Sequence, residues 1–251
     1  DETGVITAIE PRKNYIIRKA TKLSKQSHII AANVDQALLI TTIVQPHIKL
    51  GFVDRFLVTA EAYRIPVILV FNKLDLHDPG ADAVLDTVKA IYEPIGYRCV
   101  ATSALRGDHI DTLTAVLKDK VSLLSGHSGV GKSSLINAID PTLDLRTADV
   151  SDFNEKGRHT TTFAEMFPLQ EGGYIIDTPG LKSFGLLEME KSELAHYFPE
   201  MYALLPECRF YNCTHTNEPG CAVKEAVEEE AISPYRYESY LNLYYEESPG
   251  S

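Results

Sequence analysis

The sequence predicts an α/β protein: a doubly wound, mostly parallel sheet with helices on both faces, followed by a smaller, mainly helical unit. Two observations predict this fold. Between residues 36 and 124, short continuous apolar runs alternate with segments whose apolar residues recur at helical spacing. A glycine-rich segment, residues 126–131, then stands between an apolar run and another helical pattern. A loop placed between a strand and a helix in this way is typical of doubly wound sheets.

Continuous apolar runs mark the expected strands, because a strand buried on both faces has no polar side. We expect strands at residues 36–44, 66–71, 98–102 and 121–124, and a pair of strands at residues 163–169 and 174–176. Helical spacing of apolar residues predicts helices at residues 53–63, 83–92 and 110–117, and after residue 131. From residue 186 the sequence becomes helical, acidic and cysteine-bearing, which predicts a separate C-terminal unit.

The composition is that of an ordinary globular protein. The chain has 251 residues, 44% of them hydrophobic, and four cysteines that do not resemble a disulfide framework. No stretch approaches the length of a membrane span. We therefore expect a cytoplasmic protein with no membrane partner.

The charge is strongly acidic overall but uneven along the chain. A formal net charge of −11 argues against a surface that coats nucleic acid generally. Residues 11–34, however, contain no acid and carry these cations: Arg12, Lys13, Arg18, Lys19, Lys22 and Lys25. Such a basic strip is typical of local contact with phosphates, and a solvated polar face is an equally good interpretation.

The glycine-rich segment has the pattern G-x-x-x-x-G-K-S of a phosphate-binding loop. In that pattern the backbone N–H groups and the following helix N-terminus face phosphate oxygens, Lys132 reaches the β- and γ-phosphates, and the Ser133 hydroxyl binds Mg²⁺. The alternative is a glycine-rich turn without a ligand. The expected phosphate-binding residues are Gly126, His127, Ser128, Gly129, Val130, Gly131, Lys132, Ser133 and Ser134.

Two further loops predict recognition of guanine. Asn72, Lys73 and Asp75 follow a predicted strand, at the edge where α/β sheets place their ligands. A carboxylate at Asp75 can accept hydrogen bonds from the ring N–H and the amino group of guanine, and adenine lacks that pair of donors. We expect the Lys73 stem to lie along the base and Asn72 to tie neighbouring loops together. Ser103 and Ala104, after the next strand, are expected to contact the base through their backbone.

The γ-phosphate and Mg²⁺ are expected to be sensed by two more segments. Asp177 follows a predicted strand and is placed to hold Mg²⁺, and the Gly180 N–H faces the γ-phosphate. Thr161, within residues 157–162, is expected to complete the Mg²⁺ shell. Leu181 cannot orient a water molecule, so we expect slow intrinsic hydrolysis that a partner or another side chain accelerates. His159 is a candidate for that role, although a loop histidine is more often a packing residue.

Three cysteines and one histidine near the C-terminus have the composition of a zinc site. Cys208, Cys213, His215 and Cys221 lie within fourteen residues. Three thiolates and one imidazole form a closed tetrahedral site, which favours a structural zinc ion over a catalytic one. Scattered cysteines beside a surface histidine are the alternative.

The motifs occur in a circularly permuted order. Both base-recognition loops precede the phosphate loop, whereas ordinary GTPase domains begin with the phosphate loop. The same sheet can form if the chain is permuted, because permutation is tolerated where termini lie close together. The second switch, residues 177–185, then leads directly into the C-terminal unit, so nucleotide state is expected to move that unit.

The motifs in this order resemble the bacterial RsgA family, also called YjeQ or YloQ. The residues that carry the resemblance read NKLD, TSA, GHSGVGKSS, GRHTTT and DTPGL, followed by Cys-x₄-Cys-x-His-x₅-Cys. The resemblance covers essentially the whole chain. It implies an N-terminal OB-fold barrel, a circularly permuted P-loop GTPase core and a zinc-bearing C-terminal domain. It also implies GTP hydrolysis that is stimulated by the small ribosomal subunit and acts in its late maturation through rRNA binding. A hydrophobic residue at Leu181 agrees with that family.

The expected domains are a partial OB-fold RNA-binding segment at residues 1–35, the permuted GTPase at 36–185, and the zinc-binding unit at 186–251. Only about thirty-five residues precede the first GTPase strand, too few for a five-stranded barrel, so we expect the barrel to begin outside this sequence. One alternative is a GTP-dependent ribosome-binding switch in which hydrolysis serves only release. An ATP-using enzyme is disfavoured by Asp75, and nothing in the sequence demands more than a monomer.

Overall fold

A computed structural model describes residues 7–9, 11–18, 28–145, 165–177 and 190–246. Its centre is a six-stranded sheet in the order β5-β4-β3-β6-β8-β7. Every neighbouring pair is parallel except β7 and β8, which are antiparallel. The strands are β3 (Gln36–Thr41), β4 (Val67–Phe71), β5 (Arg98–Ala101), β6 (Val121–Ser125), β7 (Glu165–Pro168) and β8 (Tyr174–Asp177). All six lie within or overlap the predicted runs.

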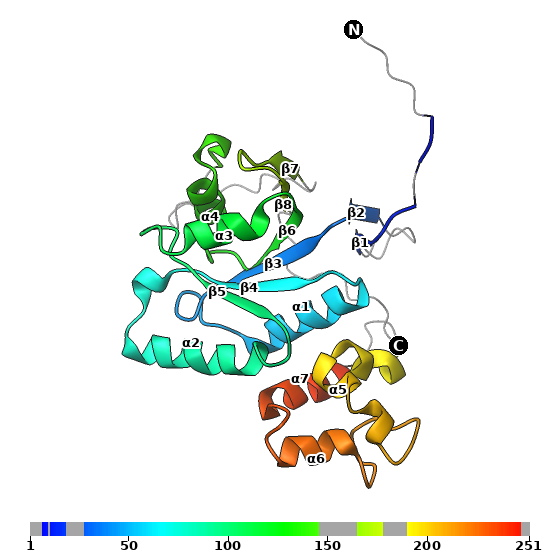
Figure 1. The fold of residues 1–251 in the computed structure, drawn as a ribbon. Coiled ribbons are helices and arrows are strands. Elements are labelled where there is room, and N and C mark those ends of the chain that lie inside the picture. The colour runs from blue at the N-terminus through cyan, green and yellow to red at the C-terminus, as the bar shows by residue number, and fades with distance from the viewer. Residues whose placement is uncertain (1–6, 10, 19–27, 146–164, 178–189, 247–251) are drawn as a thin grey trace, which may run out of the picture.

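Helices cover both faces of this sheet, as predicted for a doubly wound fold. Helices α1 (Leu50–Ala62) and α2 (Pro79–Tyr92) lie on one face, and α3 (Ile110–Leu117) and α4 (Lys132–Ile139) on the other (Figure 1). Successive side chains of β3 enter different cores: Ala37 and Leu39 pack with α1 and α2, and Leu38 and Ile40 with α3 and α4. Because both faces are buried, β3 and β4 read as continuous apolar runs.

Two element ends differ from the prediction. Helix α1 begins at Leu50, whereas the sequence predicts a start at residue 53. The earlier start has no sequence signal, because the first turn is partly exposed and Lys49, the residue before it, makes no side-chain cap. Strand β3 ends at Thr41 rather than at residue 44. A turn at residues 44–47 follows instead, and the Thr42 hydroxyl donates to the Pro46 carbonyl oxygen within it at 2.6 Å.

A two-stranded antiparallel sheet, β1 (Tyr15–Arg18) and β2 (His28–Ala32), precedes β3. Its Ile16 side chain is fully buried in the α1–α2 core, and Tyr15 makes an edge contact with Tyr63 at the end of α1. Within the described residues this pair of strands is the part that corresponds to the expected partial OB fold. The barrel itself stays a prediction.

The C-terminal unit is mainly helical, as predicted. Its elements are η3 (Lys191–Tyr197), α5 (Pro199–Tyr202), η4 (Leu205–Glu207), α6 (Ala222–Glu228) and α7 (Pro234–Tyr245). They form a third core, which Val58 of α1 enters from the sheet side. The unit therefore packs against α1, on the side away from the sheet (Figure 1).

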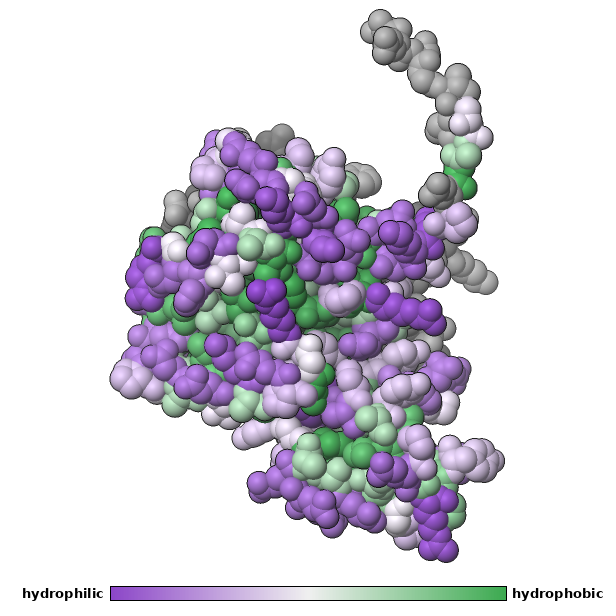
Figure 2. Space-filling model, in the orientation of Figure 1, coloured by the Kyte–Doolittle hydropathy of each residue, from purple (hydrophilic) through white to green (hydrophobic). Residues whose placement is uncertain are grey.

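The outer surface fits a globular protein. Figure 2 shows hydrophilic residues over most of the visible face, with hydrophobic residues gathered on part of the C-terminal unit. None of the helices in the described part of the chain combines the length and apolarity that crossing a membrane requires.

Candidate nucleotide and zinc sites

The predicted nucleotide-binding loops share one edge of the sheet. Residues 72–75 follow β4, residues 102–104 follow β5, the phosphate loop follows β6, and Asp177 ends β8. These strands are all parallel, so their carboxyl ends lie at the same edge. The parallel pairing of the strands thus brings together segments that are up to about a hundred residues apart.

The phosphate loop is closely confined on two sides. A Cβ atom at Gly126 would collide with the carbonyl oxygen of Ile40, at the end of β3. A Cβ atom at Gly131 would lie 2.6 Å from Asn72 Nδ2, and Gly131 has the left-handed φ of 87° that favours glycine. Val130 is buried in the core beneath the loop, whereas Ser128, Gly129 and Ser134 are exposed.

Lys132 and Ser133 open helix α4. The Lys132 ammonium donates to the carbonyl oxygens of Gly126 and His127, at 2.8 and 3.1 Å. Burial lowers the pKa of Lys132, and the nearby Asp177 carboxylate opposes that shift. The ammonium group therefore lies above the loop, at a half-buried position that a phosphate anion could reach.

Asn72 links the base-recognition loops to the phosphate loop. Its side chain is 1% exposed, and its Nδ2 donates to the Val130 carbonyl oxygen at 2.9 Å. Its Oδ1 accepts from the Ala104 N–H at 3.1 Å and from the Thr102 hydroxyl at 3.3 Å. One buried amide thus holds three loops together, which is the arrangement that the sequence predicts for Asn72.

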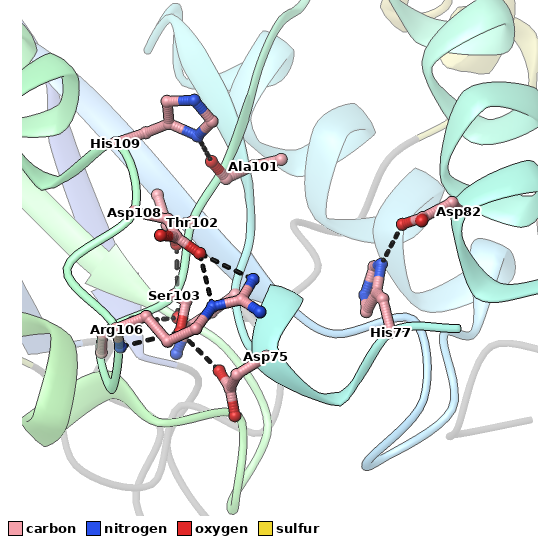
Figure 3. A network of polar contacts seen from close by, with 11 residues as sticks. Asp75, His77, Asp82, Ala101, Thr102, Ser103, Arg106, Asp108 and His109 are labelled. Carbon is pink, nitrogen blue, oxygen red and sulfur yellow. Dashed lines mark hydrogen bonds and ion pairs between the residues drawn. The ribbon is translucent and has the colours of Figure 1, made fainter. Parts of the chain in front are cut away.

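Asp75 is oriented by a hydroxyl group that the sequence analysis did not assign. Ser103 Oγ donates to Asp75 Oδ1 at 2.5 Å and accepts from the Arg106 N–H at 3.1 Å. The Arg106 side chain in turn binds the Asp108 carboxylate, at 2.7 Å (Figure 3). From the sequence, Ser103 is expected to make only a backbone contact. The overlooked signal is a hydroxyl residue following Thr102, next to the predicted base loop.

Lys73 lies along the phosphate loop. Its backbone has a left-handed φ of 70°, and its Nζ donates to the Gln45 carbonyl oxygen at 3.0 Å. Its Cε lies 3.8 Å from the Cβ position of Gly131. The aliphatic stem therefore lies beside the loop, and its expected contact with the base stays a prediction.

Not all predicted residues can be placed. Asp177 is half-buried at the end of β8, near Lys132. His159, Thr161, Gly180 and Leu181 lie outside the described residues, and their predicted roles stay predictions.

The four predicted zinc ligands converge. The ligand atoms of Cys208, Cys213, His215 and Cys221 all lie within 4.8 Å of one another. His215 Nδ1 lies 3.7 Å from Cys208 Sγ and 3.4 Å from Cys221 Sγ. Tetrahedral zinc, with bonds of about 2.0 to 2.3 Å, separates its nitrogen and sulfur ligands by about 3.5 Å. Burial also lowers the pKa of His215, which favours the neutral imidazole that a metal needs. The donor set and spacing therefore fit a structural zinc ion.

Further hydrogen bonds, made by residues that are not metal ligands, hold the loop that carries His215. The Glu218 carboxylate accepts hydrogen bonds from the backbone N–H groups of Thr214 and Thr216, at 2.8 and 3.0 Å. From helix α7, Tyr237 donates to the His215 carbonyl oxygen and Tyr240 to that of Thr214, both at 2.7 Å. Glu218, Tyr237 and Tyr240 were not predicted from the sequence, since none has the pattern of a ligand.

Comparisons with known proteins agree with the fold. Residues 9–187 match the family described as RsgA GTPase. The chain is 53% identical over 248 residues to the small ribosomal subunit biogenesis GTPase RsgA of Bacteroides fragilis strain YCH46, covering 99% of this chain and 80% of that protein. It is 53% identical over 250 residues to the protein of the same name from Porphyromonas gingivalis strain W83, covering 98% of this chain and 79% of that protein.

Two solved structures share the fold. YjeQ from Thermotoga maritima has a TM-score of 0.80 and 38% identity, over 97% of this chain and 78% of that chain. YloQ, described as a circularly permuted GTPase, has a TM-score of 0.71 and 32% identity, over 95% of this chain and 81% of that chain. The predicted fold, a circularly permuted GTPase, is therefore confirmed, and this chain belongs to the RsgA GTPase family.

Proposed function

We propose that GTP binds along the carboxyl edge of the sheet, with guanine at Asp75 and the phosphates in the loop of residues 126–134. The observation that carries this proposal is the Asn72 side chain, which joins both base-recognition loops to the phosphate loop. A nucleotide spans a base site and a phosphate site, and a buried amide between the two fixes their separation. The Ser103 hydroxyl supports the assignment of Asp75, because it holds the carboxylate in one orientation.

Hydrolysis is assigned to the charged and backbone groups around the phosphates. Lys132 and the N–H groups of the loop neutralise the charge that develops on the transferring phosphoryl group. Ser133, Asp177 and Thr161 are the proposed Mg²⁺ ligands, and Mg²⁺ bound with GTP supplies further charge neutralisation. Ser133 and Asp177 are at the expected edge of the sheet. The Gly180 N–H is the proposed sensor of the γ-phosphate.

Activation from outside is the second part of the proposal. Leu181 has no hydrogen-bonding group, so water must be oriented by another group, and His159 is the candidate in this chain. The relatives in Bacteroides and Porphyromonas are named small ribosomal subunit biogenesis GTPases. We infer that this chain acts in biogenesis of the same subunit, in the cytoplasm, and that the subunit stimulates its GTP hydrolysis.

Domain roles follow from this proposal. Residues 1–35 with their basic strip contact rRNA, residues 36–185 bind and hydrolyse GTP, and residues 186–251 carry the structural zinc and relay the nucleotide state to the subunit. The chain acts as a monomer toward that partner. The basic strip supports rRNA contact because the rest of the chain is acidic.

GTP turnover tests the proposal directly. Phosphate release is measured for the chain alone, with purified small subunits, and with large subunits as a control. We expect a large rise with small subunits only. Asp177→Asn should abolish turnover, whereas Asp111→Asn, an exposed acid on α3, should not change it. Fast turnover without ribosomes would contradict the activation proposal, and tight GTP binding without turnover in any mixture would favour the pure switch.

A further inference from the structure

We propose that Phe52 is a positioning residue for the phosphate loop: its ring holds His127 and thereby sets where Lys132 meets the phosphates. The inference rests on the proposed GTP site, because His127 belongs to the same loop. Phe52 lies in the first turn of α1, more than seventy residues before the loop, and no nucleotide-binding pattern includes it.

The contact itself is close. The ring centroids of Phe52 and His127 are 3.9 Å apart, and the planes are inclined by 37°, so the two rings are in direct contact in a tilted arrangement. Both side chains are half-buried. Aromatic pairs in such contact contribute attraction beyond the area that they bury. The pair therefore fixes the position of one side chain at the beginning of the phosphate loop.

The contact with Phe52 acts on the first half of the loop, and other residues hold the second half. The second half of the loop is fixed by Asn72, which binds the Val130 carbonyl oxygen, and by burial of the Val130 side chain. In the first half, Lys132 Nζ donates to the carbonyl oxygens of Gly126 and His127, and residues Ser128 and Gly129 are exposed. The His127 side chain thus provides a contact between that half of the loop and helix α1.

The position of His127 bears directly on catalysis. Its carbonyl oxygen accepts a hydrogen bond from Lys132 Nζ at 3.1 Å. A shift of the His127 backbone therefore displaces an acceptor of the lysine that is proposed to meet the β- and γ-phosphates. A small displacement of a charged group at a reacting phosphate is costly, because its contribution depends on prior alignment.

Helix α1 is a firm base for Phe52, since it is held on two sides. Phe56 and Leu57 pack in the core beneath the sheet. On the other side, Val58 enters the core of the C-terminal unit, and Asp54 pairs with Arg236 of α7. Phe52 is two residues from that ion pair. The C-terminal unit therefore supports, through α1, the ring that holds the phosphate loop.

The test compares Phe52→Leu, which removes the ring, with Phe52→Tyr, which keeps it. Dissociation of fluorescent GDP and the kcat and KM of GTP hydrolysis are measured in the full chain. Phe52→Leu should raise the Kd for GDP by about three- to tenfold and lower kcat/KM for GTP by a similar factor. Phe52→Tyr should restore wild-type values. Arg55→Ala, on the next turn of the same helix, is the matched control and should leave both constants unchanged.

A double-mutant cycle with His127→Leu decides whether the effect passes through the ring pair. We expect Phe52→Leu to have little further effect once His127 has lost its ring. Equal effects in both backgrounds, or wild-type affinity in Phe52→Leu, would overturn the inference. Zinc content and melting temperature report whether each variant is folded. Failure of the wild-type chain to bind GTP would instead refute the proposed function.

Discussion

Arg236 of α7 and Asp54 of α1, which are 182 positions apart in the sequence, form an ion pair at 2.6 Å in which both side chains are 1% exposed. The Glu200 carboxylate accepts a further hydrogen bond from Arg236 Nε at 2.6 Å. The hydroxyl of Tyr92, on α2, donates a hydrogen bond to the same oxygen of Asp54. Burial raises the pKa of Tyr92, which keeps that hydroxyl protonated. The C-terminal unit is thereby joined to both helices on one face of the sheet.

Removal of Arg236 should weaken this junction strongly. Arg236→Met leaves Asp54 and Glu200 buried without their cation, which costs about 3 to 5 kcal/mol of unfolding free energy. Arg55→Ala is the control, because it breaks a pair with Glu246 at the same interface that is partly exposed. Its cost should stay below about 1 kcal/mol. Urea unfolding monitored by tyrosine fluorescence measures both, and equal losses would contradict a special role for the buried pair.

Guanine selectivity should depend on Asp75. Asp75→Ala removes the proposed acceptor for two guanine donors, so the affinity for GTP should fall by at least about a hundredfold and the preference over ATP should disappear. Asp86→Ala, an exposed acid on α2, should bind GTP normally. Ser103→Ala should cause a smaller loss of about three- to tenfold, because the carboxylate stays but loses its orienting hydroxyl. Competition binding with GTP and ATP measures all three variants, and retained preference in Asp75→Ala would refute the base assignment.

The zinc cluster should govern the C-terminal unit and leave the sheet intact. Cys208, Cys213 and Cys221 contribute to the core of that unit, whereas the two cores of the sheet are separate. Cys221→Ser should lose bound zinc and the near-ultraviolet circular dichroism of the α7 tyrosines, because structural zinc supplies folding free energy. Cys99→Ser, in β5, should keep one zinc ion per chain. Zinc analysis of the purified variants checks both, and full zinc in Cys221→Ser would exclude this site.

Asp140 should give the phosphate-loop helix a stability that depends on pH. This buried carboxylate follows α4 and accepts hydrogen bonds from Thr142 and, at 2.9 Å, from the Gln170 N–H. The Thr142 hydrogen bond lowers the pKa of Asp140 below its ordinary 3.8. A carboxylate whose pKa is lower in the folded state than in the unfolded state stabilises the fold. This stabilisation is complete above the pKa of the unfolded state and is lost as the pH falls through the pKa of the folded state.

Asp140→Asn should therefore cost about 1 to 2 kcal/mol at neutral pH, because its amide nitrogen cannot accept the Gln170 hydrogen bond. The difference in unfolding free energy between this variant and the wild type should become smaller as the pH falls below about 3.8. Urea unfolding between pH 7 and pH 3 measures it. Asp144→Asn, an exposed neighbour, serves as the control. A gap that stays constant to pH 3 would mean that the charge of Asp140 contributes nothing.

The buried strands were predictable because local sequence carries their signal. All five residues of β4 are buried, and an apolar run with loop residues at its end is visible without any partner. Strands β1 and β2 were both missed, since their pairing spans a basic stretch that reads as a polar strip. The four zinc ligands were also predictable, because they are close in sequence and their chemistry is distinctive.

The sequence by itself determined the order of motifs, the loops proposed to bind guanine and phosphate, the four candidate zinc ligands and the alternating core of the sheet. Each of these depends on residue type at short spacing. Only the tertiary structure decided that Ser103 orients Asp75, that Phe52 contacts His127, and that Arg236 meets Asp54. In the sequence these are ordinary helix and loop residues. Their contacts form only when packing brings distant elements together. Burial then strengthens the interaction that a charge or a ring makes, and no local sequence pattern indicates that burial.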